Sequence, residues 1–96
     1  MTYEKVLKVF GDYLNIDTDS EILNTSRGRM VVYWESCHNT WVTTRLAQTP
    51  EELRDILRER YEQFQSYEFS QANKRDPDPE ERKEIARMGA ELAARC

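Results

Sequence analysis

Apolar and polar residues alternate through Arg29–Leu46, the only long stretch of the chain that is rich in β-branched and aromatic residues. Alternation with a period of two predicts β-strands, which we expect over residues 29–36 and 40–47. Between them, Ser36-Cys37-His38-Asn39 has the composition of a turn. The sequence therefore predicts a β-hairpin around which the rest of the chain is organised.

The length of the hairpin loop decides which side chains share a face, because strand side chains alternate between the two faces. A three-residue loop over residues 37–39, with Asn39 in the left-handed conformation, gathers nearly all the apolar residues on one face. A loop of two or four residues would mix the two sets. We therefore expect a core face that comprises Met30, Val32, Trp34, Val42, Thr44 and Leu46. The opposite face would comprise Arg29, Val31, Tyr33, Glu35, Trp41, Thr43 and Arg45.

A further strand is predicted over residues 20–25, just before this hairpin. Ser26-Arg27-Gly28 would connect it to the next strand, with Gly28 supplying the positive φ that such a loop needs. The same loop rule places Ile22 opposite Val32 and therefore on the core face. The three strands together predict an antiparallel meander.

Helical spacing of apolar residues predicts three helices, over residues 2–14, 50–72 and 79–95. The second begins at Thr49, which is followed by proline and two glutamates, and this is typical of a capped helix start. Asp78 begins the third helix with the same chemistry. The last helix has a narrow stripe of small apolar residues, so it could pack closely against another helix of the chain or of a second copy in a homodimer.

The order helix, three strands, helix, helix predicts the α+β class, and 96 residues are the size of one domain, 1–96. Charged residues make up 33% of the chain and hydrophobic residues 39%, so the core must be small. The first two long helices can cover the predicted core face. The pattern leaves open whether the last helix covers the opposite face, which carries Tyr33 and Trp41.

The charge and the absence of targeting features narrow the functional class. A net charge of -4 argues against a general nucleic-acid binder, which needs a basic footprint. No stretch approaches the roughly 20 apolar residues of a membrane span, and no secretory signal is present. Two cysteines do not make a disulfide framework, so we expect a cytoplasmic protein that makes no contact with membranes.

Candidate chemistry is sparse. A nucleophilic Cys37 needs its base within about 3 Å, and neighbours at a hairpin tip tend to point apart, so we do not expect Cys37 and His38 to be in contact. Zinc would have to use Cys37, His38 and Cys96, whereas a structural site takes four ligands at short spacings. Asp17 and Asp19 lack the glycine and distal glutamate of a calcium loop. We predict no catalytic residue, no metal and no cofactor, with a thiol-dependent enzyme using Cys37 kept as an alternative.

The face opposite the predicted core is the candidate binding surface. Aromatic residues and arginine are enriched at interface hot spots, which favours another protein as the partner and Trp41 as the anchor. The same pattern could stack the bases of a single-stranded nucleic acid, which stays open as an alternative. A third interpretation makes this face a second core layer beneath the last helix. The predicted binding residues are Arg29, Tyr33, Trp41, Thr43 and Arg45.

The predicted order of elements resembles that of small phage-encoded inhibitors of Cas9. Order alone transfers no residue. The resemblance implies a small, non-enzymatic accessory or inhibitor protein of a phage or mobile element that acts on nucleic-acid machinery.

Overall fold

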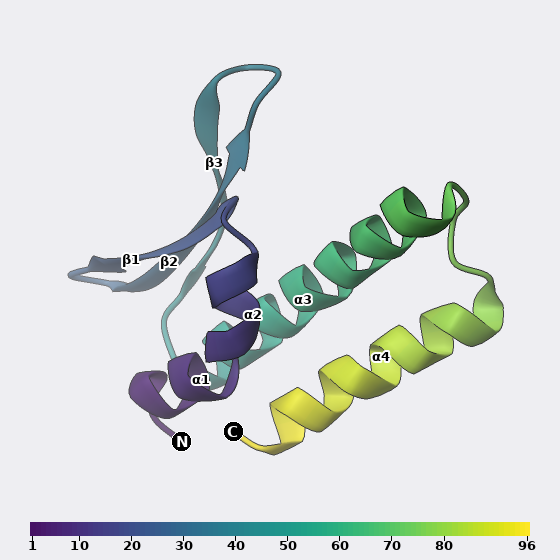
Figure 1. Cartoon of the computed structure of the whole chain (residues 1–96). Coiled ribbons are helices and arrows are strands. Elements are labelled where there is room, and N and C mark those ends of the chain that lie inside the picture. Colours follow the sequence, from purple (N-terminus) through teal and green to yellow (C-terminus); the bar gives the residue numbers. More distant parts are fainter.

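The chain folds into a three-stranded antiparallel sheet with helices on one of its faces. The computed structural model describes residues 1–96, apart from the side chain of Thr44. The elements are α1 (Tyr3–Val9), α2 (Gly11–Ile16), β1 (Ser20–Thr25), β2 (Gly28–Glu35), β3 (Thr40–Ala47), α3 (Pro50–Asn73) and α4 (Pro79–Ala94). The predicted α+β class is confirmed, as are the meander with strand order β1-β2-β3 and the two long helices after it (Figure 1).

The first helix departs from the prediction. Instead of one helix over residues 2–14, the structure has α1 and α2, separated at Phe10, whose ψ of 7° is not helical. Thr2 caps α1 as expected by accepting a hydrogen bond from the backbone N–H of Lys5. The break re-aims the chain so that both Phe10 and Tyr13 are buried. The other predicted elements agree with the observed bounds to within one residue at either end.

The two long helices begin at the predicted caps. The Thr49 side chain accepts from the backbone N–H of Glu52, and Asp78 forms a complete capping box with Glu81. Arg75 also donates two hydrogen bonds to Glu81, at 2.8 and 3.1 Å. This contact with Arg75, followed by the backbone contact at Asp78, lowers the pKa of Glu81 to about 2. Together these bonds fix the connector between α3 and α4.

The core lies between one face of the sheet and the helices α1, α2 and α3. α3 contributes its buried residues, Leu53, Ile56, Leu57 and Tyr61. Tyr13 of α2 meets the ring of Tyr61 edge-on, with centroids 5.5 Å apart. The sheet contributes Val31 and Ala47, both wholly buried. The buried cluster consists of Val6, Phe10, Tyr13, Val31, Ala47, Leu53, Ile56, Leu57 and Tyr61.

The first turn of the sheet is shorter than predicted. Thr25 pairs with Gly28, so residues 26–27 alone form the turn, although Gly28 has the expected positive φ, of 139°. Ile22 consequently lies opposite Val31 and not opposite Val32. The predicted register of β1 was wrong by one residue, and the error places Ile22 on the other face of the sheet.

The second turn is longer than predicted. Glu35 pairs with Thr40, which leaves a four-residue loop over 36–39, and Asn39 has the expected left-handed conformation, with a φ of 52°. Trp34 therefore pairs with Trp41 instead of Val42. The register shifts between Val31 and Val32, so that the predicted pairing of Met30 with Leu46 is still found nearer the base of the hairpin. The predicted position of the Thr44 side chain falls outside what the structure describes.

The helices cover the face that the sequence predicted to be away from the core. Long side chains with polar ends allow this, because their stems pack on the core while their charged or hydroxyl ends reach its edge. The covered face consists of Ile22, Arg29, Val31, Tyr33, Val42, Arg45 and Ala47. The opposite face, called the open face below, consists of Glu21, Leu23, Met30, Val32, Trp34, Trp41, Thr43 and Leu46.

The last helix resolves the question that the sequence left open. α4 packs along α3, on the side of that helix away from the sheet (Figure 1). Met88 and Leu92 reach the edge of the core from this position. α4 therefore extends the helical layer and leaves the open face of the sheet uncovered. Within the described part of the chain, no helix has the combination of length and apolar character that crossing a bilayer requires.

Candidate functional site

The open face of the sheet presents apolar side chains that the helices do not cover. Trp41 is 46% exposed and Leu23 is 45% exposed. Among the side chains that the structure describes, none on the open face belongs to the buried cluster or packs against it. Large apolar surfaces left in contact with water are typical of sites where a protein binds something else.

The two tryptophans of the chain meet on the open face. Trp34 and Trp41 are cross-strand partners, and their rings form an edge-to-face pair with centroids 5.3 Å apart and planes at 74°. Such a pair contributes about 0.5–1.5 kcal/mol beyond the area it buries, so it also stiffens the hairpin. The pair is thus a rigid aromatic surface with little conformational entropy left to lose on binding.

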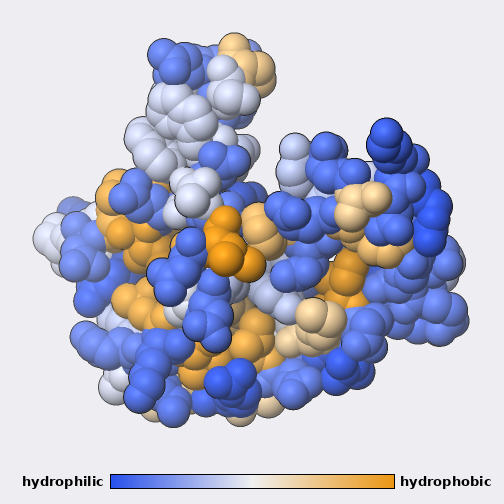
Figure 2. Space-filling view, in the orientation of Figure 1, coloured by the Kyte–Doolittle hydropathy of each residue, from blue (hydrophilic) through white to orange (hydrophobic). Residues whose placement is uncertain are grey.

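The outer part of the β2–β3 hairpin stands clear of the helices. Figure 1 shows β2 and β3 continuing past the helical layer, and Figure 2 shows the same hairpin projecting from the body of the molecule, with mostly pale or blue side chains along it. The four-residue loop at its end is exposed. Trp41, the exposed member of the pair, is therefore accessible to a partner.

The structure separates the five predicted binding residues. Trp41 and Thr43 lie together on the open face, whereas Arg29, Tyr33 and Arg45 lie on the covered face. The prediction that all five form one surface was wrong, because the register changes by one residue within the hairpin. Arg29 packs its guanidinium 4.5 Å from the ring centre of Tyr3, and its Nε is buried.

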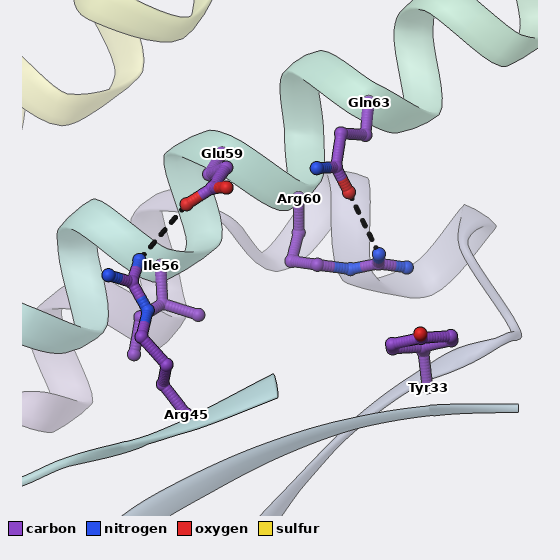
Figure 3. Close-up of a pocket in the computed structure, with 6 residues that line it drawn as sticks. All are labelled: Tyr33, Arg45, Ile56, Glu59, Arg60 and Gln63. Carbon is purple, nitrogen blue, oxygen red and sulfur yellow. Dashed lines mark hydrogen bonds and ion pairs between the residues drawn. The ribbon is translucent and has the colours of Figure 1, made fainter. Parts of the chain in front are cut away.

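Tyr33 and Arg45 instead line a cavity of about 430 Å³ between the covered face and α3 (Figure 3). Arg45 forms an ion pair at 3.0 Å with Glu59, which also lines the cavity. Arg60 lies 4.8 Å from the ring centre of Tyr33 and donates to Gln63 at 3.0 Å. The four residues of α3 that line the cavity, Ile56, Glu59, Arg60 and Gln63, were not predicted as site residues, because spacing along one helix does not show which strand side chains it will meet.

A buried polar network around Asp17 lies next to Arg60, one of the residues that line the cavity. Asp17, only 5% exposed, accepts hydrogen bonds from the hydroxyl groups of Tyr13 at 2.5 Å and Ser20 at 2.8 Å. Ser20 in turn accepts from Arg60 at 3.1 Å. Burial, followed by the hydrogen bond to Asp17, raises the pKa of Tyr13 far above its usual value. The network holds the connector between α2 and β1 against α3, which is a structural role.

The loop of the hairpin brings Cys37 and His38 together, contrary to the prediction that they point apart. The Sγ atom of Cys37 lies 3.5 Å from Nδ1 of His38 and 3.4 Å from Oε1 of Glu35. Nδ1 of His38 is itself in contact with the same carboxylate oxygen. Cys96, the other thiol, lies at the end of α4, where burial raises its pKa and it donates to the carbonyl oxygen of Leu92.

Comparisons of the chain with protein-family models, with curated proteins and with solved structures give no match.

Proposed function

We propose that the chain is a small, non-enzymatic protein-binding module whose docking surface is the open face of the sheet. The observation that carries this proposal is the pair of Trp34 and Trp41, held on an uncovered sheet face with Trp41 46% exposed. Tryptophan is among the residues most enriched at interface hot spots, where a rigid aromatic anchor fills a pocket of the partner. Leu23 and Met30 continue the apolar surface toward the base of the sheet.

A protein partner fits this face better than a single-stranded nucleic acid. Binding of single strands combines stacking on aromatic rings with a positively charged groove. The described side chains of the open face include the carboxylate of Glu21 and no lysine or arginine, while Arg29 and Arg45 lie on the covered face. Aromatic rings without nearby cations favour burial against another protein.

The chemistry of the chain also favours a particular kind of partner. With a net charge of -4, the chain attracts a surface rich in lysine and arginine, which speeds association and disfavours acidic competitors. Proteins that handle nucleic acids carry such basic surfaces. The partner we propose is a basic protein that presents an apolar pocket for Trp41. An accessory or inhibitor protein of a phage or mobile element, acting on nucleic-acid machinery, is the specific form of this function.

The arrangement at the hairpin tip argues against a thiol-dependent enzyme. A catalytic histidine uses one ring nitrogen to take the proton of the nucleophile and the other to bind an orienting group. Here Nδ1 of His38 contacts both Cys37 and Glu35. A single nitrogen cannot serve both purposes in a proton relay, so the open face and not the tip is our candidate for function.

Binding should be tested with a partner that the immobilised chain captures from a lysate of the source organism and that is then purified. We would measure the dissociation constant for the native chain and for Trp41→Ala, with Tyr67→Ala as the matched control. Tyr67 is another exposed aromatic residue, 61% exposed, but it lies on α3. Loss of a tryptophan anchor costs about 2 kcal/mol or more, so Trp41→Ala should weaken binding roughly 30-fold, while Tyr67→Ala should not.

Three results would contradict the proposal. Equal effects of Trp41→Ala and Tyr67→Ala would show that the open face is not the docking surface. Unfolding of Trp41→Ala, judged by circular dichroism, would show that Trp41 is a core residue. An acidic partner, or an oligonucleotide that binds more tightly than any captured protein, would overturn the class of partner.

A further inference from the structure

Three different metal-ligating groups converge at the tip of the β2–β3 hairpin. The carboxylate of Glu35, the thiol of Cys37 and the imidazole of His38 each offer one donor atom, and these atoms lie within 4.8 Å of one another. We propose that Glu35, Cys37 and His38 form a zinc site. This site is distinct from the open face and does not depend on the proposed docking function.

The distances between the donor atoms suit a tetrahedral ion. Zinc binds sulfur at about 2.3 Å and nitrogen or oxygen at about 2.0–2.2 Å, so neighbouring ligand atoms of a tetrahedral site lie roughly 3.4–3.6 Å apart. Sγ of Cys37 lies 3.4 Å from Oε1 of Glu35 and 3.5 Å from Nδ1 of His38. Two of the three edges of the site therefore already have the length that the ion requires.

The third edge of the site would have to lengthen. Nδ1 of His38 and Oε1 of Glu35 are in direct contact, which leaves no room for an ion between them. The Glu35 carboxylate would rotate away from the ring as zinc binds, and any proton on the zinc-bound nitrogen would be released to solvent. The thiol of Cys37 would release its proton to solvent as the bond from sulfur to zinc forms, which leaves a neutral imidazole, a thiolate and a carboxylate around the ion.

The fold supplies the site because the loop has four residues. Pairing of Glu35 with Thr40 closes the loop, and Asn39 in the left-handed conformation turns the chain back. Glu35 sits at the end of β2 while Cys37 and His38 follow within the loop, so one short segment provides all three donors. The side chain of His38 is 71% exposed, and the fourth position of the ion faces solvent, where water would complete the tetrahedron.

Cobalt(II) provides a spectroscopic probe for this site. Bound to a thiolate, it gives a charge-transfer band in the near ultraviolet, and in a tetrahedral site it also gives intense visible bands. We would titrate the reduced native chain with cobalt(II), displace the cobalt with zinc and determine the stoichiometry. The matched pair of variants is Cys37→Ser and Cys96→Ser, since each removes one of the two thiols of the chain. Glu35→Gln and His38→Gln test the other ligands.

We expect one cobalt ion per monomer, tetrahedral visible bands and full displacement by zinc, all unchanged in Cys96→Ser. Cys37→Ser should abolish the charge-transfer band, and the other two variants should weaken binding at least tenfold. No visible bands in the native chain would overturn the proposal. So would loss of the charge-transfer band in Cys96→Ser with retention in Cys37→Ser, or one ion shared by two chains. Circular dichroism of each variant checks that the fold is intact, which the exposed loop position favours.

Discussion

Replacing Tyr13 with phenylalanine removes one hydroxyl group from the interior and leaves the ring in place. That hydroxyl donates to Asp17 at 2.5 Å, and both residues are at least 95% buried. Net contributions of hydrogen bonds to charged groups are about 1.5–3 kcal/mol, because an unsatisfied buried carboxylate keeps its desolvation penalty. Ser20 still donates to Asp17 at 2.8 Å in the variant, so we expect a loss near the middle of this range, about 2 kcal/mol.

Urea unfolding followed by circular dichroism measures this loss. For a chain of this size, about 2 kcal/mol should lower the urea midpoint by roughly 1–2 M and the melting temperature by about 8–16 °C. Tyr67→Phe is the control, because Tyr67 is 61% exposed and should change neither value. A Tyr13→Phe variant as stable as the native chain would show that the hydroxyl contributes nothing to the stability of the network.

Tyr13 should also cause the protein to lose stability at high pH. The folded state holds the proton of Tyr13 to a pKa far above the usual value, whereas the unfolded chain releases it near pH 10. The stabilisation is therefore fully present below about pH 10 and is lost as pH rises above it, at up to about 1.4 kcal/mol per pH unit. Tyr13→Phe should remove this part of the alkaline slope. An equal slope in both proteins would contradict the assignment.

The remaining predictions concern the sheet and the cap of α4. Leu23→Lys should change the free energy of unfolding by less than about 1 kcal/mol, because the Leu23 side chain is 45% exposed. Val31→Lys should unfold the chain, because Val31 is wholly buried. The opposite result in thermal melts would show that the two faces of the sheet are assigned the wrong way round. Gly28→Ala should lower the free energy of unfolding in urea by roughly 2 kcal/mol or more. Gly28 has a φ of 139°, and an added Cβ would collide with the carbonyl oxygen of Ala47 at the end of β3. An unchanged urea midpoint would argue against this turn. A nuclear magnetic resonance titration should give Glu81 a pKa of about 2, so its contribution to stability is present above the ordinary carboxyl pKa and lost as pH falls toward 2. Arg75→Gln should return this pKa toward its usual value, and no change would exclude the ion pair as its main cause.

The sequence predicted the elements well because their signals are local. The caps at Thr49 and Asp78 and the strand composition of the hairpin each depend on a few neighbouring residues, and each is found where it was expected. The left-handed conformation of Asn39 is another example. The break at Phe10 was missed because it serves the burial of that ring against distant elements, which no local pattern reports.

The sheet faces were predicted wrongly for a different reason. A three-residue loop at each turn would collect the apolar residues on one face, so the two turns are not independent evidence for that face. The structure has one loop shorter and one longer than this, and a shift of register between Val31 and Val32. Moreover, Arg29 and Tyr33 can face the helices because their long stems bury, while the Arg29 guanidinium packs on the ring of Tyr3 and the Tyr33 ring packs under Arg60. Apolar content alone therefore does not identify the face that helices will cover.

One candidate site could be predicted from the sequence and the other could not. Trp41 was identified from its residue type, and the structure leaves it exposed as the binding hypothesis needs. Glu35 was not connected with Cys37 and His38, because a three-residue loop would have ended the hairpin differently. The observed four-residue loop brings its carboxylate to the thiol and the imidazole.

A docking surface on the open face requires that Trp41 be exposed to solvent, ready for a partner. Trp34→Phe makes Trp41 the only tryptophan, so acrylamide quenching of the fluorescence of this variant reports on that one ring. We expect red-shifted emission and quenching close to that of an exposed indole. Blue-shifted emission with strong protection from acrylamide would show that Trp41 is enclosed, and the proposed docking surface would not exist.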